Sequence, residues 1–202
     1  KDILVLGKVK QLERDGAADL IVLDAPAAGH AVSFLMSASG LLDAVRAGPI
    51  RAQARDVVDV LTDPDRCQVL LVTLPEETPV NEVVETAEKL QDRVGVALAA
   101  VVVNGLYPAL AGLDVDPEAA AEAAGVRLEP GEADHLRAAA EFRRRRPALH
   151  ATPVERLARA LPLPRVELPF LFTTDVGPTE IGHLATALTE SVARLPDAGA
   201  AP

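Results

Sequence analysis

Cysteine and aromatic residues are scarce in this chain of 202 residues. The one cysteine, Cys67, can form neither a disulfide framework nor a thiolate zinc site within the chain, and it favours a reducing, cytoplasmic compartment. Four Phe, one Tyr and no Trp are too few for a surface that stacks the bases of a single strand. These shortages argue against a secreted disulfide scaffold and against a single-strand-binding protein.

Basic charge and long apolar runs are also scarce. Twenty Lys and Arg stand against thirty Asp and Glu, which gives a formal net charge of -10. A negative long-range field repels phosphate, so we expect no nucleic-acid partner. The longest apolar run, 97–103, is far shorter than the roughly 20 residues of a membrane-spanning helix, so we expect no integral membrane segment.

The first half of the chain alternates short apolar runs with helical patterns. Runs that are apolar on both faces are typical of buried parallel strands, and they occur at 19–24, 67–73 and 97–104. The spacing of apolar residues predicts helices at 49–61 and 78–90. Pro49 and Pro79 suit first helical positions, and Thr78 suits a helix cap.

The second half is predicted to be mainly helical before it returns to the sheet. An Ala-rich helical section is expected at 116–161, with a second short helix from about Pro153. The last strand is predicted at 165–172 and the final helix at 178–195. The alternation of strands and helices predicts an α/β fold, a mostly parallel sheet flanked by helices, with a helical insert at about 106–164.

The most informative segment is the apolar run 19–24 with the residues that follow it, Asp24-Ala-Pro-Ala-Ala-Gly29-His30. An apolar strand that ends in Asp has the Walker B pattern, in which the carboxylate holds Mg²⁺ or its waters. The plainer alternative is that Asp24 caps the next turn. Asp24, His30 and Ser33 also have the residue types of a hydrolase triad, but no G-x-S-x-G elbow accompanies them.

With this segment the chain resembles the anion-transporting ATPase family, which includes the arsenical-pump and the tail-anchored-protein-targeting ATPases. The second switch of that family combines Asp, Ala-Pro, Gly and His after such a strand. The segments 72–76, 101–104 and 168–171 are similar to further family segments, in a pattern like that of its actinobacterial, Get3-like members.

The resemblance implies ATP and Mg²⁺ as cofactors and assigns roles near the phosphates. Asp24 would sit in the magnesium shell, the backbone N–H of Gly29 would face the γ-phosphate, and His30 would help to relay the switch. The alternative for His30 is a surface histidine that is hydrogen-bonded to its loop.

The same resemblance assigns three residues to the adenine base. The amide of Asn104 would pair with the base edge, because it offers a donor and an acceptor together. Pro169 and Phe170 would pack on the base. Without the resemblance, Asn104 is equally well a turn residue after a strand, and the other two are core residues.

A phosphate-binding loop is missing from the 202 residues: no G-x-x-x-x-G-K-[ST] occurs, and Gly7-Lys8 is followed by Val9. On the resemblance, residues 1–202 are the C-terminal part of one P-loop ATPase domain that contains the helical insert. We expect the chain alone to be inactive, because it lacks the loop's row of backbone donors and its lysine.

The chain also differs from some members of this family in its cysteine and methionine content, and these differences argue against two of the family's functions. One cysteine disfavours soft-metal transport, and one methionine, Met36, does not make the Met-rich groove of members that bind membrane helices. The basic run Arg143–Arg146 is interpreted as the solvated end of a helix, with contact to an acidic partner as the alternative.

We expect a Mg-dependent ATP hydrolase of the cytoplasm that couples its nucleotide cycle to conformational change. Its partners would be a homo- or heterodimer with a related ATPase subunit and an unknown protein client. The alternative is a module that binds nucleotide or a partner without hydrolysis. A Gly-rich loop ending in Gly-Lys-Thr/Ser upstream of Lys1 would favour the hydrolase.

Overall fold

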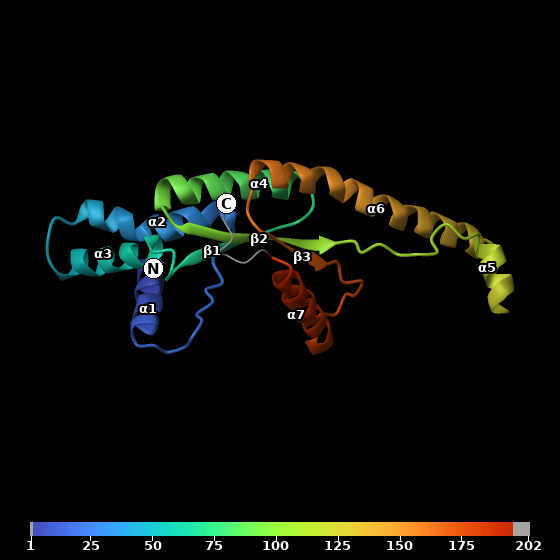
Figure 1. Ribbon diagram of the computed structural model, residues 1–202, viewed down its shortest axis with the longest axis horizontal. Coiled ribbons are helices and arrows are strands. Elements are labelled where there is room, and N and C mark those ends of the chain that lie inside the picture. The colour runs from blue at the N-terminus through green and yellow to red at the C-terminus, as the bar shows by residue number, and fades with distance from the viewer. Residues whose placement is uncertain (1, 196–202) are drawn as a thin grey trace. The chain divides into compact units, whose positions relative to one another are not determined.

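The computed structural model describes residues 2–195, as helices and strands that alternate over much of the chain (Figure 1). The elements are α1 (Asp2–Arg14), α2 (Ala28–Ala44), α3 (Pro49–Thr62), β1 (Gln68–Thr73), α4 (Glu77–Lys89), a π-helical turn η1 (Leu90–Val94), β2 (Ala97–Leu106), α5 (Pro117–Ala124), α6 (Glu132–Ala160), β3 (Arg165–Pro169) and α7 (Pro178–Ala193).

The strands form a parallel sheet flanked by helices, in the order β1-β2-β3, which confirms the predicted α/β fold. In β2 the run Ala100–Val103 is buried without interruption, as expected for a parallel strand between two neighbours. Parallel strands need crossover connections, and the helices between β1, β2 and β3 supply them.

The chain divides into two compact units. Of the described residues, the first comprises 2–72, Asn81–Val101 and Ala160–Pro164; the second comprises Thr73–Val80, Val102–Arg159 and 165–195.

Helices α1, α2 and α3 pack together in the first unit. Phe34 and Leu35 of α2 and Val57 of α3 are buried in its core. The buried Lys10 donates to the Asp56 carboxylate at 3.3 Å, which compensates its charge.

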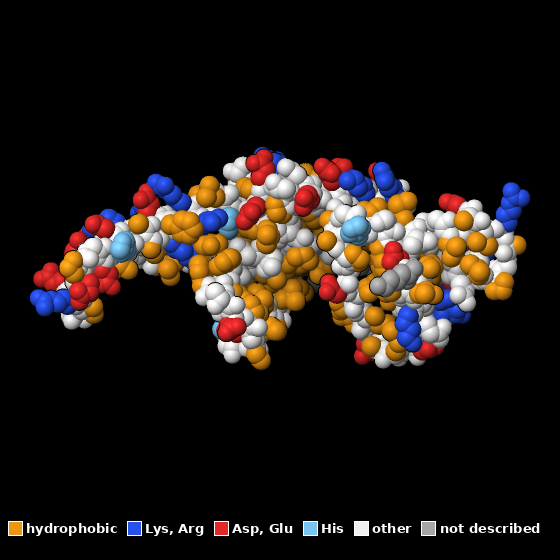
Figure 2. Space-filling view, turned by 180° about the vertical axis from the view of Figure 1, so that it is seen from behind, with side chains coloured by type: hydrophobic (Ala, Val, Ile, Leu, Met, Phe, Trp, Pro, Cys, Tyr) orange, Lys and Arg blue, Asp and Glu red, His pale blue; other side chains and the backbone are white. Residues whose placement is uncertain are grey.

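In the second unit, α7 packs on β3 and α6 returns toward the start of α4. The backbone N–H of Glu167 donates to the Ser191 hydroxyl at 3.1 Å, and Arg156 donates to the Glu77 carbonyl at 3.0 Å. Hydrophobic side chains also reach the surface (Figure 2); those on α7 are Ile181, Leu188 and Val192.

The predicted strand at 19–24 is wrong. This segment has no regular secondary structure, and Leu20 and Val22 are 78% and 82% exposed. A strand exists only where a neighbour accepts and donates its backbone hydrogen bonds, and the described sheet offers the segment no such neighbour.

Several predicted boundaries shift. α4 begins at Glu77, so Thr78 lies inside its first turn and is not a cap. β3 ends at Pro169 instead of continuing to Phe172. Helix α2 was not predicted.

α6 continues through Pro153, where a separate short helix was predicted. It is one helix of 29 residues that contains both Pro147 and Pro153. Even so, none of the helices in residues 2–195 is long and apolar enough to cross a membrane.

β1 is buried on one face, not on both as predicted. Leu71 is 6% exposed, whereas its neighbours Leu70 and Val72 are 52% and 62% exposed. Successive side chains of a strand point to opposite faces, so one face of β1 lies in the core.

We therefore expect Leu71→Ala and Leu70→Ala to differ strongly in stability. Leu71→Ala should lower the free energy of unfolding by about 2–5 kcal/mol, because it opens a cavity in the core. Leu70→Ala is the matched control and should cost about 1 kcal/mol or less, since its side chain is already half in water. Urea unfolding of both variants measures the difference; equal losses would show that both faces of β1 are covered.

Candidate functional site

Asn104, Pro169 and Phe170 lie at the carboxyl ends of two adjacent strands. Asn104 is near the end of β2, Pro169 ends β3 and Phe170 follows it. The N–H of Phe170 donates to the carbonyl of Leu106 at 2.8 Å, which extends the pairing of the two strands to this point. Ligands of open α/β sheets gather at such an edge.

Gly105, next to Asn104 near the end of β2, has a backbone conformation that favours glycine. Its φ is +79°, a conformation that residues with a side chain rarely adopt. A Cβ built on Gly105 would lie 3.8 Å from Cδ2 of Phe170 and 3.8 Å from Cδ2 of Leu74. The ring of Phe170 thus lies at van der Waals distance from the end of β2, and Phe170 remains 39% exposed.

The carboxyl ends of β2 and β3 also carry an aromatic and basic group, here called the Tyr107 cluster, which the sequence analysis missed. It contains the chain's one tyrosine and two of its four phenylalanines. The members are Tyr107, Phe170, Phe172, Arg143, Arg146 and His150. Arg143, Arg146 and His150 share one face of α6 by their spacing, but no local pattern links that face to Tyr107, Phe170 and Phe172 at the ends of β2 and β3.

The basic run lies inside α6 and not at a helix end as predicted; Arg144 and Arg145 are exposed to solvent, whereas Arg143 and Arg146 are partly buried. The guanidinium of Arg143 lies 4.8 Å from the ring centre of Tyr107 and 4.6 Å from that of Phe172. It also donates to the carbonyl of Pro108 at 2.9 Å. Arg145 instead pairs with Glu141 on an exposed face of the helix.

His150 is buried beneath Tyr107. Its side chain is 6% exposed, and its ring meets the Tyr107 ring edge-on at 5.4 Å. Nδ1 is buried and has no hydrogen-bond partner among the described residues. Burial lowers the pKa of His150, and the charge of Arg146 lowers it further, whereas the carboxylate of Glu76 opposes the shift. The neutral imidazole is therefore the favoured form.

Asp24, Gly29 and His30 lie in the first unit. Asp24 is exposed in the extended segment before α2 and forms no hydrogen bond or ion pair with the rest of the described chain. Gly29 and His30 belong to the first turn of α2. The N–H of His30 donates to the carbonyl of Ala27 at 2.8 Å, whereas that of Gly29 has no earlier carbonyl in the helix. The Ser33 hydroxyl donates to the backbone carbonyl of His30 at 3.0 Å, an arrangement unlike a hydrolase triad.

Two groups of this segment have the chemistry to contact a phosphate with its magnesium ion: the carboxylate of Asp24 and the backbone N–H of Gly29. A Cβ built on Gly29 would meet no atom within 4 Å, so a ligand has room to approach its backbone. Within residues 2–195 no three His, Cys, Asp or Glu residues converge as a metal site. Mg²⁺ needs only one or two carboxylates when phosphates and waters supply its other ligands, so Asp24 is sufficient on the protein side.

Cys67 is half-buried just before β1, and desolvation raises the pKa of its thiol. A raised pKa keeps the sulfur protonated and weakly nucleophilic.

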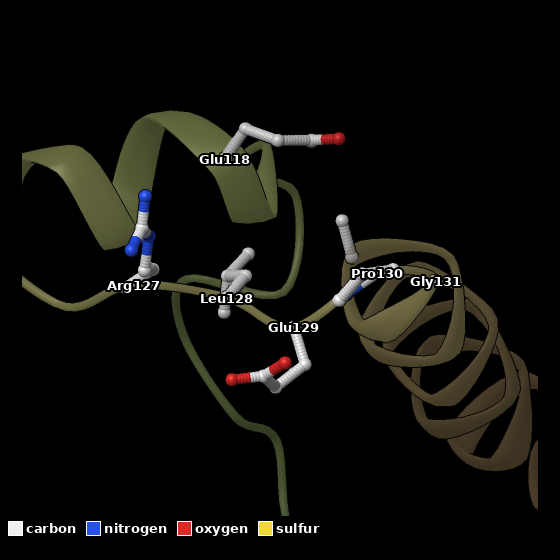
Figure 3. A pocket seen from close by; sticks show the side chains of 7 residues that line it. Glu118, Arg127, Leu128, Glu129, Pro130 and Gly131 are labelled. Atoms are coloured by element: carbon white, nitrogen blue, oxygen red, sulfur yellow. The ribbon is translucent and has the colours of Figure 1, made fainter.

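A pocket of about 520 Å³ lies between α5 and the start of α6 (Figure 3). Its lining combines Arg127 with the carboxylates of Glu118 and Glu129, beside Leu128, Pro130, Gly131 and Ala133. None of the predicted site residues lines it.

The lowered pKa of His150 predicts a loss of stability in weak acid. An unfolded histidine titrates near pH 6.5, so below that pH the unfolded chain takes up a proton that the folded chain resists. The stability associated with neutral His150 is thus present above about pH 6.5 and is lost as the pH falls through the folded pKa.

In the unchanged chain the urea concentration at the midpoint of unfolding should fall between about pH 7.5 and 5.5. His150→Phe should make this fall smaller, because it removes the titrating group and keeps a ring against Tyr107. His135→Phe replaces an exposed histidine of the same helix and should behave as the unchanged chain does. An undiminished fall in His150→Phe would assign the acid sensitivity to other groups.

Comparisons with known proteins point to ATPases. No family model matches the sequence. The chain is 33% identical over 144 residues to "ATPase BagA" of Mycobacterium tuberculosis. The aligned residues are 68% of this chain and 40% of that protein. Its identity to "Putative arsenical pump-driving ATPase" of Halobacterium salinarum is 34% over 108 residues, 50% of this chain and 17% of that protein.

The chain thus spans about two fifths of the length of its mycobacterial relative. A protein of Mycobacterium bovis, named "Putative ATPase Mb3704", matches with the same identity and coverage. These similarities relate the chain to proteins named as ATPases.

Proposed function

We propose that this chain is part of a Mg-dependent ATP hydrolase of the anion-transporting ATPase family. The observation that carries the proposal is its 33% identity over 144 residues to proteins named as ATPases. In this proposal, residues 1–202 form the C-terminal part of one P-loop domain, with the helical insert at about 106–164. The placement of Asn104, Pro169 and Phe170 at one edge of the sheet supports a nucleotide site.

In this proposal, Asn104, Pro169 and Phe170 contact the base of the nucleotide. The Asn104 side chain offers an amide donor and a carbonyl acceptor, which match N7 and N6 of adenine. The exposed part of the Phe170 ring provides an apolar surface for the flat base, and Pro169 holds the backbone next to it.

The phosphates contact the segment before α2 and its first turn. Mg²⁺ neutralises the charge that develops as the phosphoryl group is transferred. Asp24 holds the ion or its waters through its carboxylate, and the N–H of Gly29 donates to a phosphate oxygen. His30, next to Gly29 in the same turn, passes a displacement of this turn on to the rest of α2.

The nucleotide cycle then controls a partner interaction. Binding and hydrolysis change the segment 24–30, and the change acts on a homo- or heterodimer with a related ATPase subunit and on a protein client, in the cytoplasm. A module that binds nucleotide without turnover is the alternative, and the activity of the full-length protein decides between the two.

Asp24→Asn in the full-length protein should lower ATP turnover about 100-fold or more, a loss of about 3 kcal/mol of transition-state stabilisation. The neutral amide removes the charge that holds Mg²⁺, while the exposed site leaves the fold intact. Asp19→Asn, an exposed carboxylate of the same extended segment, is the matched control and should keep full turnover. Full turnover in Asp24→Asn would contradict the Walker B role, and no turnover in the unchanged protein would favour the binding module.

Asn104→Ala should weaken the preference for adenine over guanine by about 1–3 kcal/mol, because both amide contacts to the base are lost. Competition between ATP and GTP for the full-length protein measures this preference. Asn81→Ala, an exposed asparagine on α4, should leave it unchanged. If Asn104→Ala keeps the full preference, Asn104 only ends its strand.

A further inference from the structure

Three side chains from one face of α6 surround the ring of Tyr107. The guanidinium carbons of Arg143 and Arg146 lie 4.8 and 5.5 Å from its centre, and the His150 ring lies at 5.4 Å. Residues spaced by three and four share one face of a helix, so α6 presents all three together. Tyr107 is therefore the point at which the end of β2 meets α6.

The loop after β3 meets the same ring. Phe170 stacks on Tyr107 with ring centres 4.7 Å apart and an interplanar angle of 28°. Phe172 contacts Tyr107 edge-on at 5.2 Å and Phe170 at 4.9 Å. Phe170 thus has Tyr107 behind it, while 39% of its surface remains exposed.

Arginine is held here by aromatic rings and not by carboxylates. Within the described part of the chain, neither Arg143 nor Arg146 forms an ion pair. Nη1 of Arg143 is buried and has no hydrogen-bond partner among the described residues. Its guanidinium lies over the rings of Tyr107 and Phe172, at 4.8 and 4.6 Å from their centres, where the negative faces of the rings attract the cation.

We propose that Tyr107 and Arg143 are positioning residues that hold Phe170 as a stacking platform for a planar purine base. The choice of ligand rests on the function proposed above, whereas the role of Tyr107 and Arg143 rests on their contacts with Phe170 and Phe172. Arg143 fixes the Tyr107 ring, Tyr107 supports Phe170 from behind, and the base stacks on the exposed part of Phe170. Base affinity then depends on a guanidinium of α6 that does not touch the base.

Tyr107 provides a direct optical test in the chain without any ligand. It is the only tyrosine of the 202 residues, and tryptophan is absent, so tyrosine emission and its near-ultraviolet circular dichroism report on this ring. Arg143→Gln should weaken the dichroism and make the emission easier to quench with acrylamide. Arg144→Gln is the matched control, because Arg144 is exposed in the same run; it should change neither signal.

Nucleotide affinity in the full-length protein tests the effect on the base. Tyr107→Leu and Arg143→Gln should each raise the KM for ATP about tenfold at unchanged kcat, because stacking is lost while the phosphate contacts remain. Tyr107→Phe keeps the ring and should retain the affinity of the unchanged protein. Far-ultraviolet circular dichroism confirms that each variant is folded, and Arg143→Gln carries the test if Tyr107→Leu does not fold.

The outcomes separate this inference from the proposed function. If the unchanged protein binds ATP and both variants keep its KM for ATP, the positioning role is overturned and the proposed function stands. An equal optical change in Arg143→Gln and Arg144→Gln also overturns the positioning role. If the unchanged full-length protein binds no nucleotide, the proposed function and the purine ligand are both overturned.

Discussion

The backbone N–H and C=O groups of a central parallel strand need hydrogen-bond partners on both edges of the strand. In this chain the central strand is β2. On one edge it lies beside β1, and on the other the Val101 N–H donates to Pro164 and the Leu106 carbonyl accepts from Phe170. These bonds fix the register of β2 against the segment that contains β3. Asn104, Gly105 and Tyr107 then reach the sheet edge at the same level as Pro169 and Phe170. The candidate base site is thus a consequence of strand pairing.

The elements that the sequence predicts well are those with a strong local signal. β2 is an uninterrupted apolar run, and α3 and α7 each have Pro at the first helical position with apolar spacing behind it. The segment 19–24 has an equally strong apolar signal and is not a strand, because strand formation depends on a partner elsewhere in the chain. Local pattern predicts what a segment is able to form, and tertiary pairing decides whether it does.

In the candidate site, too, some residues can be predicted from the sequence and others depend on tertiary structure. Asn104, Pro169 and Phe170 could be named from the sequence by a resemblance, and their strands place them together. Tyr107, Arg143 and His150 could not, because an arginine run has the same pattern whether it faces water or aromatic rings. The orientation of α6 decides this, and no single motif in the sequence encodes it. Asp24, Gly29 and His30 remain predictions about a phosphate site.

Two prolines interrupt α6, and the parts of the helix before and after them differ in how well their amide hydrogens are protected from exchange with solvent. Pro147 has no N–H to donate to the carbonyl of Arg143, and Pro153 has none for that of Leu149, so the backbone ladder is interrupted twice. The buried residues of α6, His150 and Leu157, both follow Pro147. The stretch 132–142 has no buried residue to resist opening, so its amide hydrogens exchange with solvent sooner than those that follow Pro153. Arg143 thus lies near the boundary between a part of the helix that opens readily and a part that stays closed.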